Sequence, residues 1–168
     1  DVLNGVAQFA GTKFQGTPGS AYRFVISVDM LTTATTDVVR VVHGPAASIQ
    51  IVTQPRAGVT GDLLTRQPVV RLLDRLGYLV TSDSSTVLSI RVDSGLGGSF
   101  SGSTTATVAG GIATFAGVKF TGEPYAAYKA VFTGTPNATE LTSAQTAEFS
   151  VGHAAASQLV ITTQPVSG

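Results

Sequence analysis

Apolar and polar residues alternate over several short stretches of this chain, with the two-residue period of strands that are buried on one face. In "SIQIVTQP", Ile49 and Ile51 fall on the same face of such a strand. In "PVVRLL", Val70 and Leu72 fall on one face and Arg71 on the other. Each stretch therefore predicts a β-strand with one side toward a core and one side toward water.

The alternation continues through "TVLSIRVD", "GIATFAGVKF", "AYKAVF" and "AEFSV". In "GIATFAGVKF" the phase shifts at Ala116 and Gly117, and a shift beside a glycine indicates a bulge or a tight corner. We expect the main inward positions of all these stretches to form the structural core. They are Ile49, Ile51, Val70, Leu72, Leu88, Ile90, Phe115, Phe120, Tyr128, Phe132, Phe149 and Val151.

Turn sequences rich in Gly, Pro, Asp and Ser separate the stretches, among them "DRLG", "SDSS", "SGLGG", "AGG", "TGEP" and "GTPN". About seven short strands in roughly 108 residues, with a turn every 8–12 residues or so, are typical of an immunoglobulin-like β-sandwich. No stretch has a helical period long enough to oppose this interpretation. The predicted fold class is all-β, with Greek-key sandwich repeats in tandem.

Two motifs occur twice in the chain. "AGTKFQGTPGSAYR" begins at Ala10 and "AGVKFTGEPYAAYK" at Ala116, an offset of 106 positions. "SIQIVTQP" begins at Ser48 and "QLVITTQP" at Gln158, an offset of 110 positions. A short insertion such as "TGTPNATE" (133–140) accounts for the difference of four. The chain is therefore predicted to contain an internal repeat about as long as one ordinary domain.

The repeat predicts three segments. Residues 45–153 form one complete immunoglobulin-like repeat, residues 1–44 the C-terminal half of a preceding repeat, and residues 154–168 the first strand of a following one. The front piece leaves an apolar face without an opposing sheet. We expect that it does not fold on its own.

The order of these motifs resembles the bacterial Ig-like tandem repeats of very large surface and secreted proteins. The matching sequences are "SIQIVTQP", "QPVVRLLDRLGYLV" and "GSFSGSTTATVAGGIATFAGVKFTG", and the flanking pieces match the same pattern in part. The resemblance implies modules that serve as stalks, adhesin spacers or filament building blocks. The family's turn is often Asp-x-x-Gly-Asn, whereas here Tyr78 follows the glycine, so a calcium site in this turn is not carried over.

Composition narrows the function classes. Lys+Arg and Asp+Glu are ten each, so the chain has no net field with which to hold nucleic acid. No apolar run is long enough to insert into a membrane. The absence of cysteine excludes a disulfide scaffold and a thiolate metal site. A chain that starts at Asp1, with one Met and few Lys, fits a mature or excised piece of an exported bacterial repeat, located outside the cell or on its surface.

The sequence offers few groups for catalysis. His43 and His153 occupy equivalent places in the repeat and are interpreted as polar junction residues rather than metal ligands or a pH-sensitive hinge, because neither has a second ligand at a useful spacing. "GSFSGS" lacks the spacing of a nucleophile elbow, and "GLGGSF" has Phe100 where a dinucleotide fingerprint needs its last glycine. We predict no enzyme activity and no cofactor.

Acidic residues lie near the predicted turns and either cap those turns or hold calcium between repeats. They are Asp62, Asp74, Asp83 and Asp93. The linkers "HGPAAS" and "GHAAAS" contain no carboxylate, which favours the capping role.

Lys13 and Lys119 recur in the repeat and raise the question of an intramolecular isopeptide bond. Their only asparagine partners, Asn4 and Asn137, occupy non-equivalent places, which disfavours it. Asn137 also begins the glycosylation sequon "NAT".

The sequence predicts a non-enzymatic structural module, a stalk, spacer or filament unit whose partners are neighbouring repeats or identical copies end to end. The alternative is an adhesin or carbohydrate-binding module that grips a glycan or host ligand with loops such as 93–104 or 133–141. The aromatic residues available to such a site are Tyr78, Phe100 and Tyr125. Tyr22 and Tyr128 recur in both copies and are interpreted as core rather than as a ligand platform. A hydrolase would need a constellation of ionisable groups that the sequence does not offer.

Overall fold

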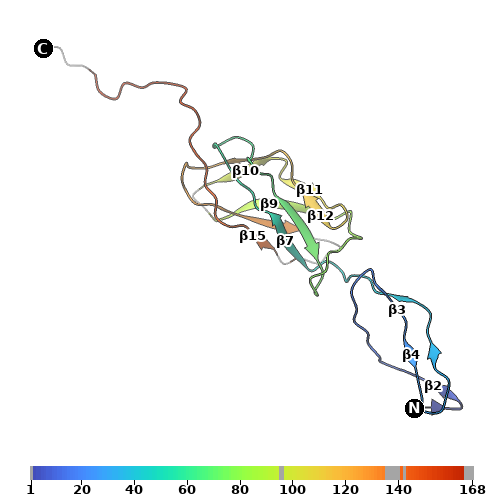
Figure 1. Ribbon diagram of the computed structural model, residues 1–168. Helices are drawn as coiled ribbons and strands as arrows, with labels where there is room; N and C mark the ends of the chain where they lie inside the picture. The colour runs from blue at the N-terminus through green and yellow to red at the C-terminus, as the bar shows by residue number, and fades with distance from the viewer. Residues whose placement is uncertain (1, 95–96, 135–140, 142, 165–168) are drawn as a thin grey trace. The chain divides into compact units, whose positions relative to one another are not determined.

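The computed structural model describes residues 2–94, 97–134, 141 and 143–164 (Figure 1). The chain divides into two compact units, residues 1–44 and residues 45–168. Within the described ranges every regular element is a strand, so the protein is all-β.

A three-stranded antiparallel sheet forms one layer of the second unit. It consists of β7 (Ser48–Thr53), β8 (Val69–Leu73) and β12 (Ile112–Thr114), in the order β12-β8-β7. Val70 is paired with Ile51 on one side and with Ala113 on the other. β8 therefore lies in the middle of this sheet and is hydrogen-bonded along both of its edges.

A four-stranded antiparallel sheet forms the other layer. It consists of β9 (Val87–Ser94), β11 (Thr105–Thr107), β14 (Lys129–Gly134) and β15 (Ala144–Gln145), in the order β11-β9-β14-β15. The side chains of both layers meet in one apolar core, and the rings of Phe115 and Phe132 lie 5.3 Å apart across it. This arrangement is compatible with a β-sandwich.

The predicted core positions are almost all inside. Ile49, Val70, Leu72, Leu88, Ile90, Phe115, Phe120, Tyr128, Phe132 and Val151 are buried. Ile51 and Phe149 are half-buried and pack against the same core. The backbone of Phe149 pairs with Tyr128 in an isolated bridge rather than within a named strand, and its ring packs on Phe100, Phe120 and Tyr128.

The phase shift at Ala116 and Gly117 is a corner between sheets. After β12 the chain turns at Gly117, whose φ of 82° favours glycine, and enters β13 (Val118–Thr121), which pairs with β10 (Ser99–Gly102). Gly102 also has a positive φ of 75°, and a Cβ atom there would collide with the carbonyl oxygen of Gly117. Gly117 divides the predicted stretch 111–120 into β12 and β13, and residues 99–102, which the sequence placed in the loop 93–104, form the strand β10. The unit therefore contains the strands β7 to β15 rather than about seven.

The segments around Val59 and Gly152, which are far apart in the sequence, run parallel to each other in the second unit. Val59 and Gly152 form a parallel bridge, in which the Thr60 amide donates to the Gly152 carbonyl at 3.1 Å and the Gly152 amide donates to Gly58 at 2.7 Å. The chain enters this unit beside β7 and leaves it at the opposite end (Figure 1). Beyond the bridge, residues 154–164 form no strand, and the side chains of Leu159, Val160 and Ile161 are exposed.

In the described part of the first unit, residues 2–44, every strand has two residues. The strands are β1 (Val2–Leu3), β2 (Val6–Ala7), β3 (Ala21–Tyr22), β4 (Val25–Ile26), β5 (Ala34–Thr35) and β6 (Val39–Arg40). They form three separate pairs, β1-β2, β3-β6 and β4-β5. No residue of 4–44 is buried, in contrast to the continuous core of the second unit.

Candidate functional site

The two histidines lie in separate units. His43 Nδ1 lies 2.9 Å from the Gly44 carbonyl oxygen, and the His153 ring packs edge-on against Tyr125 with the ring centroids 5.1 Å apart. Among the residues described, no three His, Cys, Asp or Glu side chains come together in a way that would hold a metal ion.

Asp74 and Asp83 cap turns, as the sequence predicted. The Asp74 carboxylate is buried and accepts hydrogen bonds from the amides of Leu76 and Tyr78, both at 2.9 Å. The Asp83 carboxylate accepts from the Thr86 hydroxyl at 2.7 Å and from the amides of Thr86 and Ser85 at 3.0 and 3.1 Å. Because these hydrogen bonds hold the backbone of the two turns, both side chains serve the fold.

The hydrogen bonds at Asp83 also change its acidity. Burial raises the pKa of the Asp83 carboxyl, but the bonds from Thr86 and Ser85 lower it by more, so the net pKa is below the ordinary 3.8. The other two predicted acidic positions are in different settings. The Asp62 amide donates to the Val59 carbonyl in a turn, and the Asp93 carboxylate accepts from the side-chain amide of Gln145.

The aromatic side chains available for a glycan platform are not assembled into one. Phe100 is half-buried and packs on Phe120 at 4.9 Å and on Phe149 at 6.2 Å. Tyr125 is 73% exposed and contacts His153. Tyr78 is half-buried after the Asp74 turn. The loop 133–141, with the sequon at Asn137 and the insertion at 133–140, falls mostly outside the described residues, which resume at 141 after 134.

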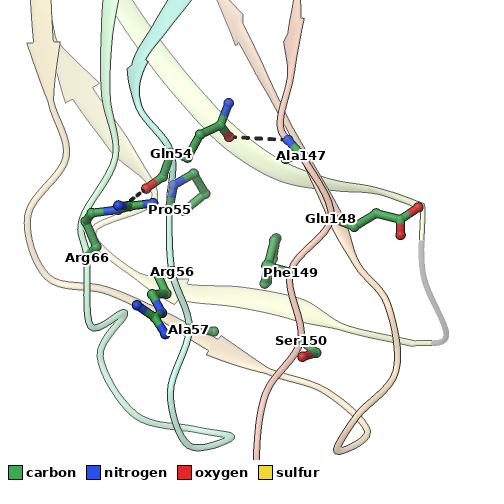
Figure 2. A pocket seen from close by; sticks show the side chains of 9 residues that line it. All are labelled: Gln54, Pro55, Arg56, Ala57, Arg66, Ala147, Glu148, Phe149 and Ser150. Carbon is green, nitrogen blue, oxygen red and sulfur yellow. Dashed lines mark hydrogen bonds between the residues drawn. The ribbon is translucent and has the colours of Figure 1, made fainter.

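The second unit has a shallow groove on its surface (Figure 2). It has a volume of about 470 Å³ and is lined by residues 54–57, Arg66 and residues 147–150. Gln54 joins its two walls, because its side-chain oxygen accepts from the Ala147 amide at 3.3 Å and its carbonyl accepts from Arg66 Nε at 2.7 Å. Sequence reasoning missed this groove, since Gln54 and Ala147 are 93 positions apart and no local motif connects them.

The groove offers positive charge and a partly apolar floor. Arg56 and Arg66 are both exposed and are held side by side by a pair of backbone hydrogen bonds of 3.0 and 3.2 Å. Phe149 contributes a half-buried ring. The Glu148 carboxylate forms a salt bridge with Lys129, with Oε1 and Nζ 3.6 Å apart. Guanidinium groups beside an aromatic ring suit a carboxylate or a hydroxyl-rich ligand.

The most distinctive feature of the structure is that matching residues in the two units make matching contacts. Phe14 and Tyr22 pack edge-on at 4.8 Å and 69°, and Phe120 and Tyr128 do so at 4.7 Å and 65°. The Tyr22 hydroxyl accepts from the Thr17 amide at 3.1 Å, and the Tyr128 hydroxyl donates to the Glu123 carbonyl at 3.3 Å. In both units the tyrosine hydroxyl thus reaches the backbone five residues before it.

Backbone pairing matches as closely. The Phe24 amide donates to Thr36 Oγ1 at 3.0 Å, and the Ala130 amide donates to Thr146 Oγ1 at 2.9 Å. In the reverse direction, each threonine amide donates to the carbonyl of its partner residue at 2.9 Å. The first residue of each pair matches at the 106-position offset and the second at the 110-position offset found in the sequence.

The change of offset has a place in the structure. In β4-β5, Ile26 pairs with Ala34, and in β14-β15, Phe132 pairs with Ala144. The four extra residues of the second unit therefore lie between Phe132 and Ala144.

Comparison with known proteins does not assign this chain to a family. No family model and no curated protein matches it. A search of the described residues for helices apolar and long enough to cross a bilayer finds none.

Proposed function

We propose that the chain is a non-enzymatic structural module made of immunoglobulin-like sandwich repeats in tandem, which acts as a stalk, spacer or filament building block of a long extracellular bacterial protein. The repeated set of contacts carries this proposal. Both units contain an edge-on ring pair, a hydrogen bond between the tyrosine hydroxyl and the backbone, and a strand pair in which a threonine hydroxyl accepts from a backbone amide. The residues that make these contacts match at the offsets of 106 and 110 positions. A duplicated unit that offers the same architecture again serves to add length.

The strand connections support the immunoglobulin-like assignment. β7 and β8 lie in one sheet, β9 crosses to the other, β12 returns to pair with β8, and β14 crosses again to pair with β9. Such alternation between two sheets is the connectivity of Greek-key sandwiches. The entry and exit of the chain at opposite ends of the second unit suit an end-to-end array (Figure 1).

The test is the length of extended chains. One, two or three additional copies of residues 45–154 are inserted after Gly44 of the full chain, and the maximum dimension is measured by small-angle X-ray scattering. A spacer gains the same increment of length with each copy. A maximum dimension that grows only with the cube root of mass would show compact association and contradict the proposal.

A second candidate, a carbohydrate-binding or adhesin module, is favoured by one observation, the groove of Figure 2. Two exposed guanidinium groups beside the Phe149 ring would hold an acidic saccharide. Screening the chain against a glycan array tests this function, with Arg56→Ala and Arg66→Ala as groove variants. Arg71→Ala is the matched control, because Arg71 is also exposed but lies outside the groove and donates to Gln50. Binding that all three variants retain would place the ligand elsewhere.

A further inference from the structure

The first unit keeps the local contacts of residues 108–153 but not their burial. Phe9 matches Phe115 and Phe14 matches Phe120 at the 106-position offset. Phe115 and Phe120 are 0% and 1% exposed, whereas Phe9 and Phe14 are 63% and 45% exposed. The side chains themselves are identical. The difference in exposed fraction therefore arises from the residues that cover these rings in the second unit and not in the first.

The neighbours that the first unit lacks can be named from the second unit. There, β12 pairs with β8, β13 with β10, and β14 with β9. In the first unit, β2 is paired with β1, the residues 12–15 that match β13 form no strand, and β4 is paired with β5. All three missing partners come from the sequence between Val69 and Gly102.

A specific niche covers the ring pair of the second unit. A Cβ atom at Gly98 would lie 2.7 Å from the Tyr128 ring, so the bare backbone of Gly98 packs directly on that ring. Phe100, two residues later, packs edge-on against Phe120 at 4.9 Å. The Phe14–Tyr22 pair has almost the same separation and tilt as Phe120–Tyr128, so it has the shape to receive the same Gly-x-Phe segment.

We propose that the exposed apolar side chains of residues 4–44 bind a polypeptide segment with the strand pattern of residues 45–107 of this chain, and that this segment completes a second sandwich. The inference rests on the proposed function and names the partner that a tandem repeat would present. The segment supplies counterparts of β8, β9 and β10 to the open strand edges, in the manner of strand addition. The exposed tail 157–164, which matches β7, supplies none of these three strands.

The test adds the missing segment to the full chain. Residues 45–107 are joined to Val2 in place of Asp1, because Val2 matches Val108 at the 106-position offset. Amide hydrogen exchange is then followed at Phe24, Thr36 and Val41, whose amides are hydrogen-bonded in the first unit. Exchange at these amides is expected to slow at least about a hundredfold, since they would exchange only through opening of a packed unit.

Two substitutions in the added segment make the result specific. Gly98→Val in that segment fills the niche over the ring pair and is expected to abolish the added protection. Arg71→Ala in that segment, on the outward face, is expected to preserve it. Unchanged exchange in the unsubstituted extended chain, or full protection despite Gly98→Val, would overturn the proposal.

Failure of this inference can be told from failure of the proposed function. Constant length increments from inserted repeats, together with an unprotected first unit, would retain the spacer function and reject this partner. Protection of the first unit that rises with concentration in the unextended chain, and that Gly98→Val in that chain leaves unchanged, would identify another surface of a second copy as the occupant and would equally reject the proposal.

Discussion

Asp83 shows how a single side chain links this fold to pH. Its pKa is lowered in the folded state by hydrogen bonds from Thr86 and Ser85, which outweigh the effect of burial. A depressed folded pKa stabilises the protein above the unfolded value, near 3.8, and this contribution is lost as pH falls through the folded pKa. We expect Asp83→Asn to make the fall in melting temperature below about pH 4 shallower. Asp29→Asn, in the unit without buried residues, is the control, and equal slopes for both variants would contradict the assignment.

Phe115 and Phe9 form a matched pair in which only burial differs. Truncating the buried Phe115 to Ala is expected to lower the free energy of unfolding by about 3–5 kcal/mol. Phe9→Ala and Arg71→Ala remove exposed side chains and are expected to change it by less than about 0.5 kcal/mol. Urea denaturation of the full chain measures all three. Equal losses from Phe115→Ala and Arg71→Ala would show that the inward and outward faces are wrongly assigned.

At the scale of elements, the corner formed by Gly102 and Gly117 decides where strands leave one sheet for the other. Gly102→Ala combines a positive φ with a collision against the Gly117 carbonyl. Gly61 has a similar φ of 85° but open space around a Cβ, so Gly61→Ala isolates the strain of the backbone alone. We expect Gly61→Ala to cost about 1–2 kcal/mol and Gly102→Ala clearly more. Thermal unfolding measures the loss of stability in both variants. Equal losses would show that the close approach of Gly102 to the Gly117 carbonyl does not add to the cost of the substitution.

The strands and their faces follow from the sequence where the pattern is local. Val70 and Leu72 alternate with Arg71, and such a period of two admits only one orientation when one face is buried. The corner at Gly117 is visible for the same reason, as a phase shift beside a glycine. The groove is not predictable in this way, because Gln54 meets Ala147 only after the sheets have assembled. The pairing of β10 with β13 likewise depends on the long-range meeting of two glycine corners.

At the scale of the whole molecule, the two units differ in what they can do alone. No residue of 4–44 is buried, and each strand there has two residues. Full burial of a large apolar side chain contributes roughly 1.5–3 kcal/mol, and residues 4–44 contain no fully buried side chain to offset their conformational entropy. A fragment of residues 1–44 is therefore expected to give a coil-like circular dichroism spectrum. A cooperative melting transition from that fragment would contradict this prediction.

The parallel bridge between Val59 and Gly152 has a mechanical consequence. A pull on the two ends of the second unit draws the segment 58–60 toward the entry of the chain and Gly152 toward its exit. Because the two segments run in the same direction, this tension slides one along the other and loads both hydrogen bonds at once. Bonds loaded together in shear withstand more force than the same bonds opened one after another. We therefore expect the second unit to stay folded under tension until the segment 58–60 and Gly152 slide past each other.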